Sequence, residues 1–74
     1  MERQVPIASQ TIRLGQLLKL AGVVASGSEV KALLASEPVY VNGQPESRRG
    51  RQLHSGDVVR VGPEDLRVVA SSGR

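Results

Sequence analysis

The sequence has no cysteine, no tryptophan and no phenylalanine, and it has a single tyrosine and a single histidine. Without cysteine the chain cannot form a disulfide or a thiolate-bound metal site. One histidine is too few to supply a set of nitrogen ligands, so we expect no metal ion and no other cofactor. The core must therefore be built from Leu, Val, Ile and Ala, whose side chains carry no polar atoms.

Long apolar runs are also missing from the sequence. No stretch approaches the ~20 apolar residues of a membrane helix, and residues 1–6 lack the apolar run of a secretory signal. We therefore expect a cytoplasmic protein with no membrane partner. The length of 74 residues allows one domain with one hydrophobic core.

Residue sets that support catalysis are absent as well. His54, Ser55 and Asp57 are the residue types of a hydrolase triad, but they are crowded into one turn and cannot align. No glycine-rich phosphate loop with a following lysine is present. The sequence therefore predicts a protein that is not an enzyme and has no small-molecule substrate.

Apolar spacing predicts a first short helix. Apolar residues recur every three or four positions from Leu14 to Ala21, which indicates a helix of about ten residues with one buried stripe. Thr11 is expected to cap its start, and Gly22 to end it in a left-handed conformation. Lys19 lies opposite the stripe and should face water or a ligand.

A second helix has a clearer start signal. Residues 26–29 form a capping box, in which the Ser26 and Glu29 side chains bond each other's backbone amides. Apolar residues from Val30 to Leu34 form the expected buried stripe. Because Pro38 disfavours helical geometry in the residue before it, the helix should end near Ser36.

After Pro38 the pattern changes to that of strands. Residues 39–41 lead into Asn42-Gly43, the dipeptide that most readily adopts a type I′ hairpin turn, so a return strand should begin at about Gln44. Further strands are expected at 58–61 and 66–69, on either side of a turn at 62–65. The predicted fold class is α+β, with a two-helix hairpin packed on a small, mostly antiparallel sheet.

The domain limits follow from these elements. We expect a single domain over residues 11–70, preceded by an N-terminal arm or edge strand at 1–10. Residues 71–74 are expected to form a flexible tail.

Positive charge is the main indication of a partner. Ten Lys and Arg residues against seven Asp and Glu residues give a net charge of +3, which suits a polyanion. Arg48, Arg49 and Arg51 fall within four positions with no acid between them. Their guanidinium groups could bond successive phosphates, although a solvated charged loop would have the same sequence.

Several segments together carry a family resemblance. They are Ile12-Arg13-Leu14, Leu17-Leu18, Gly22, Ser26, the run 39–43 and the run 56–61. Their order and spacing resemble the RNA-binding domain family of ribosomal small-subunit protein four, the alpha-L motif, over roughly residues 11–62. The likeness is strongest to small stand-alone bacterial members of the YbcJ type, which share the stretch at 17–20 and the basic segment after the hairpin. Gly15 stands where many members carry an acid, and Gly27 where many carry a cation.

The resemblance implies an alpha-L fold that binds structured RNA between the second helix and the hairpin. The candidate RNA-binding residues are Arg48, Arg49, Arg51, Lys31, Lys19, Ser26, Ser28, Arg13 and Asn42. Some have simpler explanations: Ser26 can be a helix cap alone, and Asn42 can serve turn geometry alone. Tyr40 is expected to pack rather than to stack on a base.

The predicted function is non-catalytic, translation-related binding of structured RNA, such as ribosomal RNA or tRNA, through phosphate and shape recognition. The alternative is a small protein-interaction adaptor that binds an acidic partner. We expect the protein to be a monomer.

Overall fold

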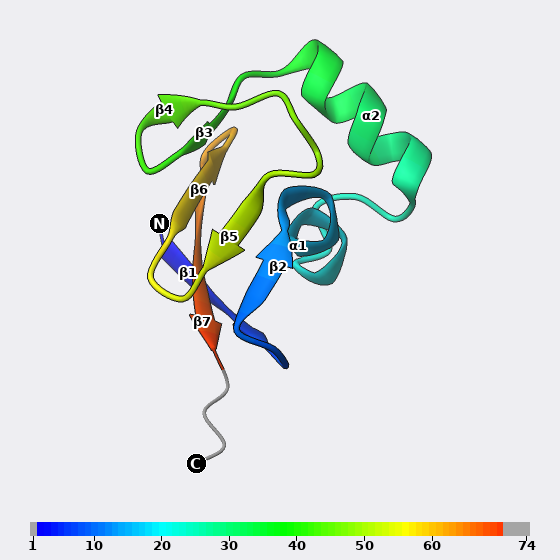
Figure 1. Ribbon diagram of the computed structural model, residues 1–74. Coiled ribbons are helices and arrows are strands. Elements are labelled where there is room, and N and C mark those ends of the chain that lie inside the picture. The colour runs from blue at the N-terminus through cyan, green and yellow to red at the C-terminus, as the bar shows by residue number, and fades with distance from the viewer. Residues whose placement is uncertain (1, 71–74) are drawn as a thin grey trace.

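The computed structural model of the chain describes residues 2–70, so the tail predicted at 71–74 lies outside the described residues. The expected α+β class is confirmed, with two helices and seven strands in residues 2–70 (Figure 1). In chain order they are β1 (Glu2–Ile7), β2 (Thr11–Arg13), α1 (Leu14–Leu20), α2 (Gly27–Ser36), β3 (Val39–Val41), β4 (Gln44–Pro45), β5 (Gln52–His54), β6 (Val58–Val61) and β7 (Glu64–Ala70).

Five of the strands form one sheet in the order β1-β7-β6-β3-β4. Only the β1–β7 pair is parallel, so the sheet is mostly antiparallel, as predicted. Val41 of β3 lies opposite Val59 of β6, which in turn lies opposite Leu66 of β7. All three are buried, so one face of the sheet carries the core.

A second sheet of two strands corrects the predicted start of the first helix. Thr11–Arg13 pairs antiparallel with Gln52–His54, and α1 begins only at Leu14, with Arg13 rather than Thr11 at the N-cap. The β-branched residues Thr11 and Ile12 suit a strand, but they form one because β5 is brought beside them. The paired residues are 39 to 43 positions apart in the sequence, so local periodicity does not reveal the pairing.

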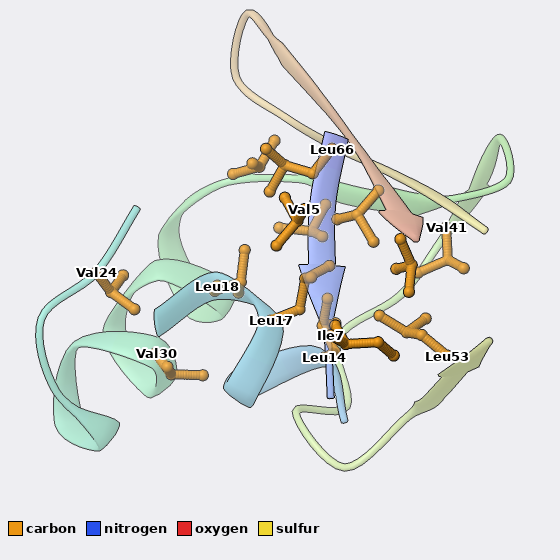
Figure 2. Packing of buried hydrophobic residues seen from close by; sticks show 14 residues of the cluster. Val5, Ile7, Leu14, Leu17, Leu18, Val24, Val30, Val41, Leu53 and Leu66 are labelled. Carbon is orange, nitrogen blue, oxygen red and sulfur yellow. The ribbon is translucent and has the colours of Figure 1, made fainter. Parts of the chain in front are cut away.

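Helix α1 supplies the centre of the core. Leu14, Leu17 and Leu18 are completely buried. Figure 2 shows them close to Val5 and Ile7 of β1, while Val24 and Val30 form the end of the cluster beside α2. Gly22 follows the helix with a φ of +78°, the left-handed conformation expected of it.

Helix α2 is capped by Ser26, whose hydroxyl accepts a hydrogen bond from the Glu29 amide at 3.4 Å. The predicted capping box is incomplete, because the Glu29 carboxylate accepts from the Ala25 amide at 2.7 Å instead of from Ser26. The helix ends at Ser36, as predicted. Only Val30 of its apolar stripe is fully buried, because α2 lies at the edge of the core.

The β3–β4 turn has the predicted geometry. Asn42 and Gly43 have φ values of 52° and 84°, as a type I′ turn requires, and the return strand begins at Gln44. The turn predicted at 62–65 is shorter than expected. Glu64 and Asp65 continue the ladder opposite Val61 and Arg60, since Gly62 takes a φ of 58° and Gly62-Pro63 suffices to reverse the chain.

Neither helix in the described residues has the length and apolar character needed to cross a membrane.

Candidate nucleic-acid interface

The loop at residues 46–51, between β4 and β5, runs toward the two helices before it returns to β5 (Figure 1). Its backbone is bonded to the start of α1. The Leu14 amide donates to the Arg51 carbonyl and the Gly15 amide to the Arg49 carbonyl, both at 2.9 Å. The first amides of a helix have no partner within the helix, so the loop satisfies two of them.

Gly15 allows this close approach. A Cβ atom at Gly15 would lie 3.3 Å from Val30 Cγ1, which is tighter than ordinary van der Waals contact, and 3.4 Å from Arg49 Cβ, at the short limit of such contact. The absence of a side chain at Gly15 therefore lets α1, α2 and the loop at residues 46–51 pack closely together.

Glu46 holds two of the three clustered arginines. Its carboxylate accepts from Arg48 Nε at 3.1 Å and from Arg51 Nη1 at 2.8 Å, and it also accepts from the Arg48 backbone amide at 2.9 Å. The Glu46 side chain is only 6% exposed. The hydrogen bonds from Arg48 and then from Arg51 lower the pKa of Glu46 to about 2. Glu46 therefore fixes the loop by binding Arg48 and Arg51. Arg49 is the one arginine of the cluster that Glu46 does not bind.

This arrangement predicts an acid-sensitive contribution to stability. A carboxylate whose pKa is lower in the folded chain stabilises the fold above its unfolded pKa of about 4.5 and loses that contribution as the pH falls toward 2. The free energy of unfolding should therefore fall more steeply between pH 5 and about pH 2 in the wild type than in Glu46→Gln. Urea unfolding at a series of pH values measures this difference; parallel curves would show that Glu46 does not contribute. Glu2 and Asp57, whose pKa values are also lowered, are common to both proteins and cancel in the comparison.

Two hollows flank Arg49. The α1–α2 hollow, of about 340 Å³, is lined by Arg13, Gly15, Lys19, Gly27 and Arg49 among others. The α2–loop hollow, of about 430 Å³, is lined by Lys31, Leu34, Ala35, Ser47 and Arg49. Because Arg49 lines both hollows, they adjoin, and we call the two together the basic groove.

The cations of the described residues divide into two sets. Five form ion pairs with N···O distances of 2.6 to 3.4 Å, namely Arg3 with Glu64, Arg48 and Arg51 with Glu46, Arg60 with Asp65, and Arg67 with Glu2. The other four cations of residues 2–70 form no ion pair with a described acid: Arg13, Lys19, Lys31 and Arg49. All four line the basic groove. The groove therefore concentrates positive charge that no acid of the described chain neutralises.

The two candidate serines lie beside the groove but do not line it. The Ser26 Oγ, which caps α2, is 3.2 Å from the Ser28 Oγ. Gly27 between them is the residue of this turn that lines the α1–α2 hollow. A contact from either serine to RNA stays a prediction.

Asn42 is not brought together with the other candidate residues in the basic groove. Its side chain donates to Asp57 Oδ1 at 3.1 Å and accepts from the Val58 amide at 3.0 Å. It lines a separate hollow that includes Tyr40 and Arg60. These bonds give Asn42 a structural role in joining two turns, and its contact with RNA stays a prediction.

His54, Ser55 and Asp57, the residue types of a hydrolase triad, form hydrogen bonds that stabilise the turn between β5 and β6. Asp57 accepts from the His54 backbone amide at 2.8 Å, and the Ser55 hydroxyl accepts from the Ala70 amide at 3.2 Å. The His54 Nδ1 is 3.9 Å from Asp57 Oδ2. Ser55 is therefore bonded to β7 rather than to the histidine. Residues 2–70 also hold no cluster of three or more His, Cys, Asp or Glu able to bind a metal ion.

Sequence reasoning missed Gly15 and Glu46 as contributors to this site. Glu46 stands two residues before the first arginine of the cluster, and that spacing was the available signal. Gly15 was noted only as a departure from the family pattern, and its structural role depends on contacts with residues 15 and 34 positions away.

Comparison with known proteins agrees with the resemblance seen in the sequence. The sequence model of the S4 domain matches residues 5–69. A protein named probable ribosome maturation protein RlbA, from Bacillus subtilis (strain 168), is 46% identical over 61 residues, which cover 82% of this chain and 86% of that protein. The chain belongs to the S4 domain family.

Proposed function

We propose that this chain binds structured RNA of the ribosome, without catalysis, through the basic groove. One observation carries the proposal: all four cations of residues 2–70 that lack an acidic partner line the same groove. Membership of the S4 domain family and the name of the ribosome maturation relative support RNA of the ribosome as the ligand.

The basic groove is suited to binding RNA phosphates, whose arrangement depends on the shape of the RNA. The Arg49 guanidinium can bond a phosphate through two N–H groups, while Lys19 and Lys31 act as mobile point charges on either side of it. The groove includes no aromatic side chain, so a stacking platform for a run of single-stranded bases is not available there. Helical RNA, which proteins contact mainly through phosphates and 2′-hydroxyls, fits this chemistry.

Side chains rather than helix amides should bind the phosphates. At the start of α2, the Glu29 carboxylate accepts from the Ala25 amide, which places negative charge where an anion would otherwise be attracted. Arg48 is tied to Glu46, but its side chain is 75% exposed and keeps further N–H donors. Arg48 and Arg51 are therefore secondary contacts that also hold the loop in place.

The salt dependence of binding tests this proposal. Log affinity for a stem-loop RNA should fall linearly with log salt concentration, with a slope of about −0.7 to −0.9 for each phosphate neutralised. Arg49→Ala should make the slope shallower by about one, whereas Arg60→Ala, which removes an equal charge outside the groove, should leave it unchanged. Filter binding or fluorescence anisotropy over a salt series measures both slopes.

The opposite result would point to another kind of partner. Equal slopes for Arg49→Ala and Arg60→Ala would show that the groove does not contact the RNA. Association of the protein with ribosomes that survives nuclease treatment would indicate an acidic protein partner instead of RNA.

A further inference from the structure

The α2–loop hollow has an apolar wall that phosphate binding does not use. Leu34 and Ala35 of α2 form this wall, and Lys31 and Arg49 line the same hollow. Leu34 is half-buried against the core, which holds its side chain in place, whereas Ala35 is exposed. A ligand that carried only phosphates would gain nothing from these two residues.

The surface next to the α2–loop hollow, outside the basic groove, carries less positive charge. A smaller neighbouring hollow of about 200 Å³ shares Leu34 and Ser47 with it and is also lined by Glu37 and by Glu46, whose charge Arg48 and Arg51 offset. An anionic group is attracted to the basic end of the hollow, at Lys31 and Arg49, and is repelled by the Glu37 carboxylate on the other side. A ligand in this place therefore has a fixed orientation, with its anion at the basic end and a neutral, partly apolar group against Leu34.

We propose that the α2–loop hollow holds one unpaired nucleotide of the bound RNA. Its base lies against Leu34 and Ala35, and its phosphate lies on Lys31 and Arg49. Ser47 lines the hollow, and its hydroxyl group can form a hydrogen bond with the polar edge of the base. This inference rests on the proposed function, and it narrows the ligand to a helix interrupted by an unpaired base.

A paired base cannot occupy the hollow, because both of its faces are stacked inside the helix. A bulged base has lost part of its stacking already, so it can be extruded at low cost. The hollow thus distinguishes an interrupted helix from a continuous one by apolar contact, while the cations bind both.

The test uses three stem-loop RNAs that are identical except at one position of the stem. The first is fully paired, the second has one bulged adenosine, and the third has an abasic residue at the bulge. The RNA with the bulged adenosine should bind roughly fivefold more tightly than the other two, since burying a few tens of Å² of apolar surface is worth about that factor.

Filling the hollow should remove this preference. Ala35→Leu places a larger side chain in the hollow and keeps all cations, so it should bring the three affinities to within about twofold of one another. Ala32→Leu is the matched control, because Ala32 is exposed on the same helix and does not line the hollow. It should keep the preference, and circular dichroism should show both variants folded.

The outcomes separate this inference from the proposed function. Equal binding of all three RNAs by the wild type would overturn the inference and leave RNA binding by the basic groove intact. A preference that survives Ala35→Leu would also overturn it, because the base would then bind elsewhere. No binding of any of the three RNAs would overturn the proposed function and the inference together.

Discussion

Replacing Lys19, Lys31 and Arg49 together by alanine is expected to lower the affinity for stem-loop RNA by at least about a hundredfold near physiological salt. Each of the three residues lines the basic groove and forms no ion pair with a described acid. All of their charge is therefore available to phosphates, and removing it removes the release of counterions that drives binding. The affinity of the purified variant measures the effect, and circular dichroism shows whether the fold is kept.

The matched control is the triple variant Arg3→Ala, Arg60→Ala and Arg67→Ala. Both triple variants take the formal net charge from +3 to 0, because each loses three of the ten cations. In the control all three cations are ion-paired outside the groove, to Glu64, Asp65 and Glu2. Exposed ion pairs contribute little to stability, so the control should fold and lose only a few-fold in affinity. Equal losses in the two variants would show that net charge, and not the groove, determines binding.

Leu18→Ala is expected to have the largest effect on stability. Leu18 is completely buried in the cluster between α1 and the five-stranded sheet (Figure 2). Removing its isobutyl group loses apolar burial and leaves a cavity, which costs about 2–5 kcal/mol. Small domains are often stable by only about 5 kcal/mol, so the variant should be largely unfolded at low urea concentrations. Urea unfolding followed by circular dichroism measures the shift in midpoint.

Leu20→Ala on the same helix is the control. Leu20 is 56% exposed, so the same truncation removes little buried surface and should cost less than about 1 kcal/mol. Leu and Ala differ little in helix propensity, so the difference between the two variants reports mainly burial. Similar midpoints for the two variants would contradict the placement of Leu18 in the core.

Local signals in the sequence predicted several elements correctly, and each has a short-range cause. Ser26 capped α2 because its hydroxyl reaches an amide only three residues away. Gly22 and Asn42-Gly43 adopted positive φ because those residues tolerate it whatever surrounds them. The buried leucines of α1 followed from their spacing, since helical periodicity places them on one face.

The errors arose where distant segments compete with local preference. Thr11–Arg13 is a strand because β5 pairs with it, although Thr11 was expected to be the N-cap of the first helix. Glu64 and Asp65 joined β7 because the ladder with β6 extends to the turn and pairs Asp65 with Arg60. In both cases a hydrogen-bonded partner strand outweighed the local propensity.

The candidate site also combines features that the sequence determines with features that only the fold determines. The sequence by itself determined the absence of cysteine chemistry, the net positive charge, the family resemblance and the positions of the arginines. Only the tertiary structure decided which cations of residues 2–70 form no ion pair with a described acid. It placed Glu46 between Arg48 and Arg51, and it brought Arg49 beside Lys19 and Lys31 from two other elements. The reason is physical: composition sets the total charge, whereas neutralisation of a charge depends on distances of a few ångströms that the fold alone creates.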